Sequence, residues 1–201
     1  MQTSKEEYEF CRKILDNYDK HIEILKSSQG CSHDRSKERE LYERSTRDKL
    51  DAIKLFCDEG NIKYQNNQIE DAIFEYKNAL IYVDYTFPED KALEEEYNNL
   101  ITRINLNLSA CFLKINEFNM TILHCNKVLQ NDPNNIKALY RLSQAYMNIY
   151  EFNKALEIIE GVLSRKDGEH SAFIKLRNDI ILMENKYKSS NCDKYKSLFS
   201  N

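Results

Sequence analysis

Apolar residues recur every three or four positions along most of this chain, a spacing that predicts amphipathic helices. Over residues 5–27 the apolar positions of this pattern are Cys11, Ile14, Leu15, Tyr18, Ile22 and Leu25. A polar stretch follows at residues 27–34, and its Ser, Gln, Gly and Asp residues are typical of a linker. We therefore expect an extra N-terminal helix, separated by a linker from the rest of the chain.

Seven further helices are expected after the linker. Ser45 stands three residues before Asp48, an arrangement that resembles a capping box and predicts a helix start. Pro88 and Pro133 interrupt the pattern, because proline cannot continue a helix. The expected helices cover about residues 46–65, 69–85, 91–115, 118–130, 136–148, 151–163 and 169–188, the last extending to about 199.

The helices form pairs that repeat along the chain. Two pairs begin at Thr102 and Ile136, which are 34 residues apart. A first pair begins at Ile53, 49 residues before Thr102, which equals the same period plus a 15-residue insertion around Pro88. A period of 34 residues is the signature of tetratricopeptide repeats, in which each unit is two antiparallel helices. The repeats are expected at about residues 53–86, 102–135 and 136–168.

Two features of the repeats concern packing. Small residues, Gly60 and Ala72 in the first repeat, are expected to let the two helices of a pair approach closely. An array of repeats also needs a cap, because its last unit leaves an apolar face uncovered. The final helix is expected to cover the third repeat with Phe173, Ile174, Leu176, Ile180, Ile181 and Met183.

The composition narrows the function classes. Only 4 Gly and 2 Pro occur in 201 residues, which favours long helices and short turns. No apolar stretch reaches the roughly 18 residues that span a bilayer, and no signal region opens the chain. The net charge of −4 argues against nucleic-acid binding. We expect a cytoplasmic protein that binds neither nucleic acid nor membrane.

No residue pattern indicates catalysis, a metal or a cofactor. The glycines are scattered, so no phosphate-binding loop is formed, and no nucleophile signature occurs. The six cysteines contain no Cys-x-x-Cys pair and are expected to be free thiols. Cys31 with His33, and His124 with Cys125, do not provide the four converging ligands of a structural zinc site.

Several stretches carry a resemblance to a known family. They are residues 42–50, 59–64, 106–114, 134–141 and 194–199. From about Tyr42 to Phe199 the chain resembles the repeat domain of large FK-binding immunophilins and of the aryl-hydrocarbon-receptor-interacting protein. The resemblance implies an all-α, right-handed superhelix of three repeats with a C-terminal capping helix. The expected domains are a helical segment with its linker, residues 1–41, and the repeat domain, residues 42–201.

The resemblance also implies a ligand. Members of this family bind the C-terminal Glu-Glu-Val-Asp tail of heat-shock protein 90, sometimes of heat-shock protein 70, with a two-carboxylate clamp. The residues that match the clamp are Asn61, Asn107, Lys137 and Arg141. Two adjacent carboxylates need cations and amide donors that converge on them, and charge-assisted hydrogen bonds are the strong ones. A co-chaperone adaptor, with a client protein as a further partner, is the function this implies.

One clamp position departs from the family. Where a lysine usually stands three residues before the glycine of the first repeat, this chain has Cys57. The loss of one charged hydrogen bond costs roughly 1.5–3 kcal/mol, or about 10- to 100-fold in affinity. Lys54 and Arg103 are the auxiliary candidates for the missing charge.

The same residues are compatible with other functions. Lys137 and Arg141 are also what an ordinary exposed helix face looks like. The repeats could be a scaffold for another peptide, or be filled by the chain's own residues 5–27. They could also be the non-catalytic part of a peptidyl-prolyl isomerase, whose β-rich domain does not fit in the 45 or so residues before the repeats. We expect no catalysis by these residues, and a monomer.

Overall fold

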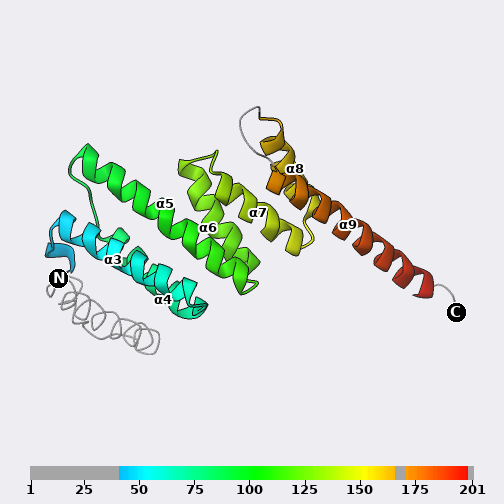
Figure 1. Ribbon diagram of the computed structural model, residues 1–201, viewed down its shortest axis with the longest axis horizontal. Helices are drawn as coiled ribbons and strands as arrows, with labels where there is room; N and C mark the ends of the chain where they lie inside the picture. The colour runs from blue at the N-terminus through cyan, green and yellow to red at the C-terminus, as the bar shows by residue number, and fades with distance from the viewer. Residues whose placement is uncertain (1–40, 166–170, 199–201) are drawn as a thin grey trace, which may run out of the picture. The chain divides into compact units, whose positions relative to one another are not determined.

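The computed structural model describes residues 41–165 and 171–198 of the protein. The helix expected at residues 5–27 lies outside the described residues. All regular elements of the described part are helices, which confirms the predicted all-α class (Figure 1). These are α3 (Thr46–Gln65), α4 (Ile69–Asp84), α5 (Lys91–Lys114), α6 (Phe118–Asn131), α7 (Ile136–Asn148), α8 (Phe152–Leu163) and α9 (Ser171–Leu198).

The turns between paired helices repeat the predicted period. Asn67, Asn116 and Tyr150 have φ angles of 63°, 63° and 64°, the left-handed region that few residues other than glycine adopt. Each stands in the turn after the first helix of a pair. Their separations, 49 and 34 residues, are those between the predicted repeat starts. The backbone therefore carries the same repeat as the sequence.

The chain divides into two compact units, the first ending at Ile104 and the second beginning at Asn105, both within α5. In the first unit α3 packs against α4. Gly60 of α3 lies against the Tyr76 ring of α4, because a Cβ atom there would be 2.6 Å from Cε1 of Tyr76. The close approach expected at Gly60 is confirmed, and the neighbour that makes it is the Tyr76 ring of α4.

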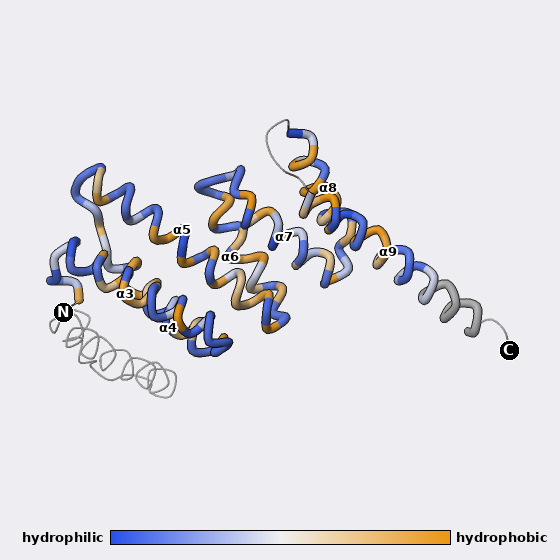
Figure 2. Tube along the Cα trace, viewed as in Figure 1, coloured by the Kyte–Doolittle hydropathy of each residue, from blue (hydrophilic) through white to orange (hydrophobic). Residues whose placement is uncertain are grey.

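In the second unit α6, α7, α8 and α9 pack against one another in chain order. Each helix carries both polar and apolar residues along its length, as expected of amphipathic elements (Figure 2). The inner face of α9 contributes Phe173, Leu176 and Ile180 to a buried cluster with α7 and α8. The prediction that Ile174 and Ile181 also cover the third repeat is wrong. They are 50% and 37% exposed, because residues seven apart share a face and theirs is the outer one.

Within the described residues, no helix combines the length and apolar character needed to cross a bilayer. The domain boundaries expected at residues 41 and 42 remain a prediction.

Candidate functional site

The start of α7 places two cations on one face. The side chain of Asn135 caps this helix by accepting a hydrogen bond of 3.1 Å from the backbone N–H of Ala138. The helix therefore begins at Ile136, and Lys137 lies in its first turn. Arg141 lies one turn further on the same face. Lys137 is exposed, whereas Arg141 is half-buried.

Arg141 is held by uncharged groups of α5. Its Nη1 donates to the backbone carbonyl oxygen of Leu106 at 2.6 Å and to Oγ of Ser109 at 3.3 Å. The Ser109 hydroxyl itself donates to the same carbonyl at 2.7 Å. A guanidinium has five N–H donors, and both bonds use Nη1. Arg141 is thus fixed in place while its positive charge has no carboxylate partner among the described residues.

Asn107 follows Leu106 on α5, so it belongs to the turn that binds Arg141. The bonds of Arg141 connect this turn to α7 and to its exposed Lys137. Three of the four predicted clamp residues, Asn107, Lys137 and Arg141, therefore lie in the second unit, on α7 and on the part of α5 to which Arg141 donates. Such a set could donate hydrogen bonds to a carboxylate from two cationic side chains and one amide N–H.

Asn61, the fourth predicted residue, lies on α3 in the first unit. Its Oδ1 accepts a hydrogen bond of 2.8 Å from the hydroxyl of Tyr76, a buried residue of α4. Because the amide oxygen is the accepting end, the bond sets the orientation of the amide nitrogen, the end that donates. Gly60 makes this possible, since only a residue without a Cβ lets the Tyr76 ring approach α3 so closely.

Cys57 supplies no charge to the first unit. Its side chain is fully buried, and burial raises the pKa of the thiol to about 12. The nearby charge of Arg103 lowers this pKa and that of Asp58 raises it, each by less than the burial does. At neutral pH, Cys57 is therefore a neutral residue of the core.

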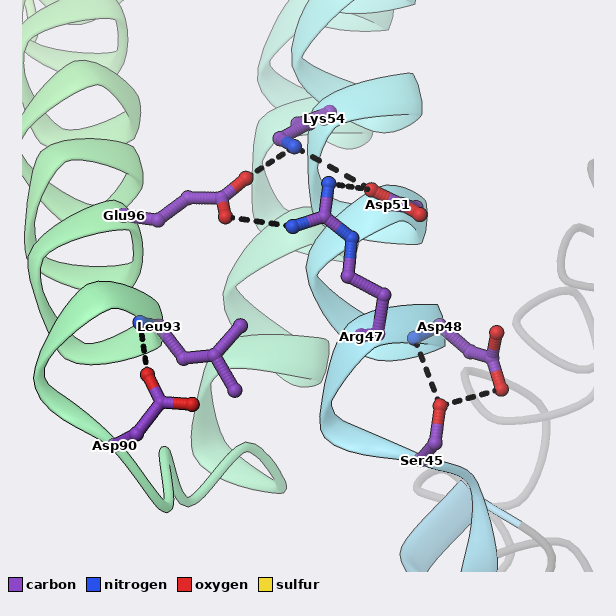
Figure 3. A network of polar contacts seen from close by, with 8 residues as sticks. All are labelled: Ser45, Arg47, Asp48, Asp51, Lys54, Asp90, Leu93 and Glu96. Carbon is purple, nitrogen blue, oxygen red and sulfur yellow. Dashed lines mark hydrogen bonds and ion pairs between the residues drawn. The ribbon is translucent and has the colours of Figure 1, made fainter.

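Lys54, the first auxiliary candidate, belongs to a network of charges between α3 and α5 (Figure 3). Its Nζ pairs with Asp51 at 3.3 Å and with Glu96. Arg47 pairs with the same two carboxylates, at 3.2 Å and 2.9 Å. The hydrogen bond from Lys54 is the main cause of a lowered pKa at Glu96, opposed by partial desolvation. Lys54 is thus already surrounded by negative charge.

Arg103, the second auxiliary candidate, pairs through Nη2 with the carboxylate of Asp58 on α3. Both side chains are solvent-accessible, at 39% and 63% of their surface. Sequence reasoning missed these carboxylate partners of the two candidates. Asp51 stands three residues before Lys54, a spacing that brings two residues together on one helix. No sequence signal identifies Glu96 and Asp58, because each pairs with a cation of another helix.

Of the residues considered for a metal, Cys31 and His33 lie outside the described residues, whereas His124 and Cys125 have other roles. Nδ1 of His124 is 2.9 Å from Oδ1 of Asn105, and its ring stacks on Phe112 with centroids 5.4 Å apart. Cys125 is fully buried, and burial raises its pKa to about 11. Across residues 41–165 and 171–198, no three potential ligands of the His, Cys, Asp or Glu type are grouped for a metal ion.

Comparison with known proteins places these features in context. No family model matches the chain. It is 34% identical over 127 residues to FK506-binding protein 5 of Rhizopus delemar and 30% identical over 129 residues to peptidyl-prolyl cis-trans isomerase FKBP4 of Bos taurus. Each alignment covers 63% of this chain, but 31% and 28% of the respective relative. The chain thus spans less than a third of the length of these curated relatives.

A solved structure matches over nearly its whole length. It is the C-terminal tetratricopeptide-repeat-containing domain of a Plasmodium falciparum FK506-binding protein, with 30% identity and a TM-score of 0.64. The match covers 75% of this chain and 98% of that domain. The chain belongs to the tetratricopeptide-repeat domains of the large FK506-binding immunophilins.

This immunophilin-type repeat domain shares its fold with other repeat proteins. The Hsp90 co-chaperone Cns1 of Saccharomyces cerevisiae has a TM-score of 0.63 at 22% identity, over 78% of this chain and 46% of that one. The predicted tetratricopeptide-repeat fold is therefore confirmed. The match to the curated isomerases falls in their repeat portion.

Proposed function

We propose that this immunophilin-type repeat domain is a co-chaperone-type adaptor that binds the acidic Glu-Glu-Val-Asp tail of heat-shock protein 90 or 70. The observation that carries the proposal is the environment of Arg141. Its two hydrogen-bond acceptors, a carbonyl and a hydroxyl, are uncharged, so they orient the guanidinium without neutralising it. An oriented, uncompensated cation is what a carboxylate ligand needs, because little rearrangement accompanies binding.

The proposal assigns a role to each clamp residue. Lys137 and Arg141 bind the two carboxylates of the terminal Asp, its side chain and the chain terminus. Asn107 donates from the turn of α5 that holds Arg141. Asn61 is assigned to the clamp because of the family resemblance. Its amide oxygen already accepts from the Tyr76 hydroxyl, which supports a donating role for its amide nitrogen. Since Cys57 is neutral, we expect affinity about 10- to 100-fold below that of a clamp with lysine at this position.

The curated FKBP4 relative is named as a peptidyl-prolyl cis-trans isomerase, but the similarity lies in its repeat portion. We propose that these residues contribute binding rather than catalysis. Any isomerase activity would then belong to other residues of a larger protein. A scaffold for an unrelated peptide is the competing function, and it predicts no preference for a free C-terminal carboxylate.

Calorimetric titration of the 201-residue chain tests the proposal. The peptide Met-Glu-Glu-Val-Asp is compared with the same peptide carrying a C-terminal amide, and each is titrated into the wild type and into Arg141→Gln. Arg177→Gln is the matched control, since Arg177 is an arginine of the same unit that pairs with Glu160 at 2.6 Å.

We expect the free acid to bind the wild type and the control. The amidated peptide and the Arg141→Gln variant should each lose at least about tenfold in affinity, because each change removes a charged hydrogen bond. Equal binding of the acid and the amide, or unchanged binding by Arg141→Gln, would overturn the proposal. Absence of binding to every chain would also overturn it and favour the scaffold function.

A further inference from the structure

A groove in the second unit lies along α8. It has a volume of about 560 Å³ and is lined by residues of α7 and α8. The side chains that α7 contributes are Leu139, Leu142 and Tyr146, of which the two leucines are buried. Ile158 of α8 adds a fourth apolar side chain. The clamp residues of α7 do not line this groove, so tail binding leaves it without a role.

Gly161 lies in the groove and inside α8. An interior glycine destabilises a helix relative to alanine, so a reason for it is expected. Gly60 has such a reason, because the Tyr76 ring occupies the space of its missing side chain. At Gly161, in contrast, none of the described residues lies within 4 Å of an added Cβ atom. That space is open to a helix of another molecule, whose backbone can approach closely where no Cβ is present.

Two opposite charges flank Gly161 symmetrically in the sequence. Glu157 stands four residues before it and Arg165 four residues after it, and both line the groove. Residues four apart lie on the same face of a helix. The C-cap, Ser164, keeps a helical backbone conformation, so Arg165 continues the line of this face. Glu157 is exposed and forms no ion pair with any of the described residues.

This order of acid, glycine and base is complementary to itself. When two copies of one helix cross antiparallel on a twofold axis, residue i of one copy lies opposite residue j of the other, and j lies opposite i. With the axis at Gly161, the two glycines face each other. Glu157 of each copy then meets Arg165 of the other, which gives two ion pairs. A second copy therefore supplies both the close approach and the opposite charges that this face can receive.

We propose that two copies of this chain associate through this face, with their α8 helices antiparallel and Gly161 at the crossing. The association covers Ile158 and the apolar side chains of α7 that line the groove. A single helix pair makes a small interface, so the dimer is weak and dissociates on dilution. The monomer expected from the sequence is then the dilute form. Lys137 and Arg141 lie outside the groove, so the dimer presents two carboxylate-binding sites.

Sedimentation equilibrium of the 201-residue chain, from about 10 µM to about 1 mM, tests the proposal. We expect the weight-average mass to rise with concentration from 23.9 kDa towards twice that value. Gly161→Gln places a long, uncharged side chain at the crossing and should weaken association at least about tenfold. Asn153→Gln, an exposed change on α8 outside the groove, should associate as the wild type does.

Charge reversal tests the two ion pairs. At these two positions Glu157→Arg leaves each copy with two cations, and Arg165→Glu leaves each copy with two carboxylates. Either variant alone should therefore associate at least about tenfold more weakly than the wild type. An equimolar mixture of the two variants restores both opposite-charge pairs and should associate about as tightly as the wild type. Lys175→Glu, an exposed charge reversal on α9, should leave association unchanged.

A mass that stays at 23.9 kDa over the whole concentration range would overturn the proposal. Association that Gly161→Gln or a single charge reversal leaves unchanged would also overturn it, because the copies would then meet through another surface. A mixture of the two charge-reversed variants that associates no better than either alone would exclude the antiparallel register. Circular dichroism of every variant checks that the helices remain. None of these outcomes alters the test of Arg141 with the acid and amide peptides.

Discussion

Arg141 in the second unit and Arg103 in the first are both accessible arginines on the first helix of a repeat, but their partners differ in charge. Arg141 donates to a carbonyl and a hydroxyl, whereas Arg103 pairs with a carboxylate. The first arrangement orients a cation and preserves its charge. The second compensates the charge before any ligand arrives. The partners across the helix interface, rather than the residue type, therefore decide whether a basic residue is ready to bind an anion.

The largest expected effect comes from making Arg141 resemble Arg103. Ser109→Asp would place a carboxylate beside Arg141, where the fully buried Ser109 hydroxyl now accepts from Nη1. We expect this variant to bind the tail at least tenfold more weakly than Ser109→Asn, a near-isosteric control without the charge, because an internal ion pair competes with the ligand. Calorimetric titration measures the difference, and thermal unfolding checks that both variants fold. Equal affinities would show that the neutrality of the Arg141 partners is unimportant.

The next effect concerns two glycines, one in each unit. Gly60→Ala should destabilise the protein by about 2 kcal/mol, since the new Cβ would overlap the Tyr76 ring and no space exists for it. This overpacking outweighs the gain of about 1 kcal/mol that alanine brings to a helix interior. Gly161→Ala is the control, because nothing lies within 4 Å of the new Cβ, and it should be stabilising. Denaturant unfolding measures both changes. A Gly60→Ala variant as stable as the wild type would contradict the close packing at Tyr76.

A smaller effect is expected at the helix caps of the two units. Asn135→Ala and Ser45→Ala each remove a side chain that accepts a hydrogen bond of 3.1 Å from a backbone N–H, and each should cost about 1 kcal/mol of stability. Only Asn135→Ala should also weaken tail binding, because it loosens the first turn of α7, where Lys137 lies. Unfolding and titration are measured on the same samples. If Ser45→Ala weakened tail binding as much as Asn135→Ala does, the loss could not be due to the loosened first turn of α7 that carries Lys137.

The smallest effect is expected from Lys54→Gln. Its network is at least partly open to solvent throughout, so the loss of stability should be under about 1 kcal/mol and should shrink as salt is added. The pKa of the Glu96 carboxyl is lowered, mainly by the hydrogen bond from Lys54. The ion pair therefore adds to the free energy of unfolding near neutral pH, and this stabilisation is lost as the pH falls through the lowered pKa of Glu96. Unfolding of the wild type and the variant at low and high salt measures it. A loss that salt does not change would mean that Lys54 stabilises through packing instead.

The helices and the repeat could be predicted from the sequence because both depend on local patterns. The apolar period gave the helix ranges, and the turn residues Asn67 and Asn116 recur with the repeat. The pairing of Arg103 with Asp58 could not be predicted, since it depends on which faces of α3 and α5 meet. The outer placement of Ile174 and Ile181 was missed for a related reason. An apolar residue in a capping helix does not by itself show which face is buried.

The candidate site was predictable to a different degree. Asn107, Lys137 and Arg141 were identified by resemblance, and the structure adds the bonds that join their helices. The sequence could not show that the partners of Arg141 are uncharged. Every residue has a backbone carbonyl, and only the fold decides which one Arg141 meets. The assignment of these residues to tail binding remains a prediction.

Nuclear magnetic resonance of the arginine and asparagine side chains tests the central claim most directly. A ¹⁵N-labelled chain is titrated with Met-Glu-Glu-Val-Asp as the free acid and as the amide. We predict that the Nε–H signal of Arg141 and the amide signals of Asn107 shift with the acid and not with the amide. If the acid peptide binds while these signals stay unchanged, or if both peptides shift them equally, Arg141 does not bind the terminal carboxylate and the account is wrong.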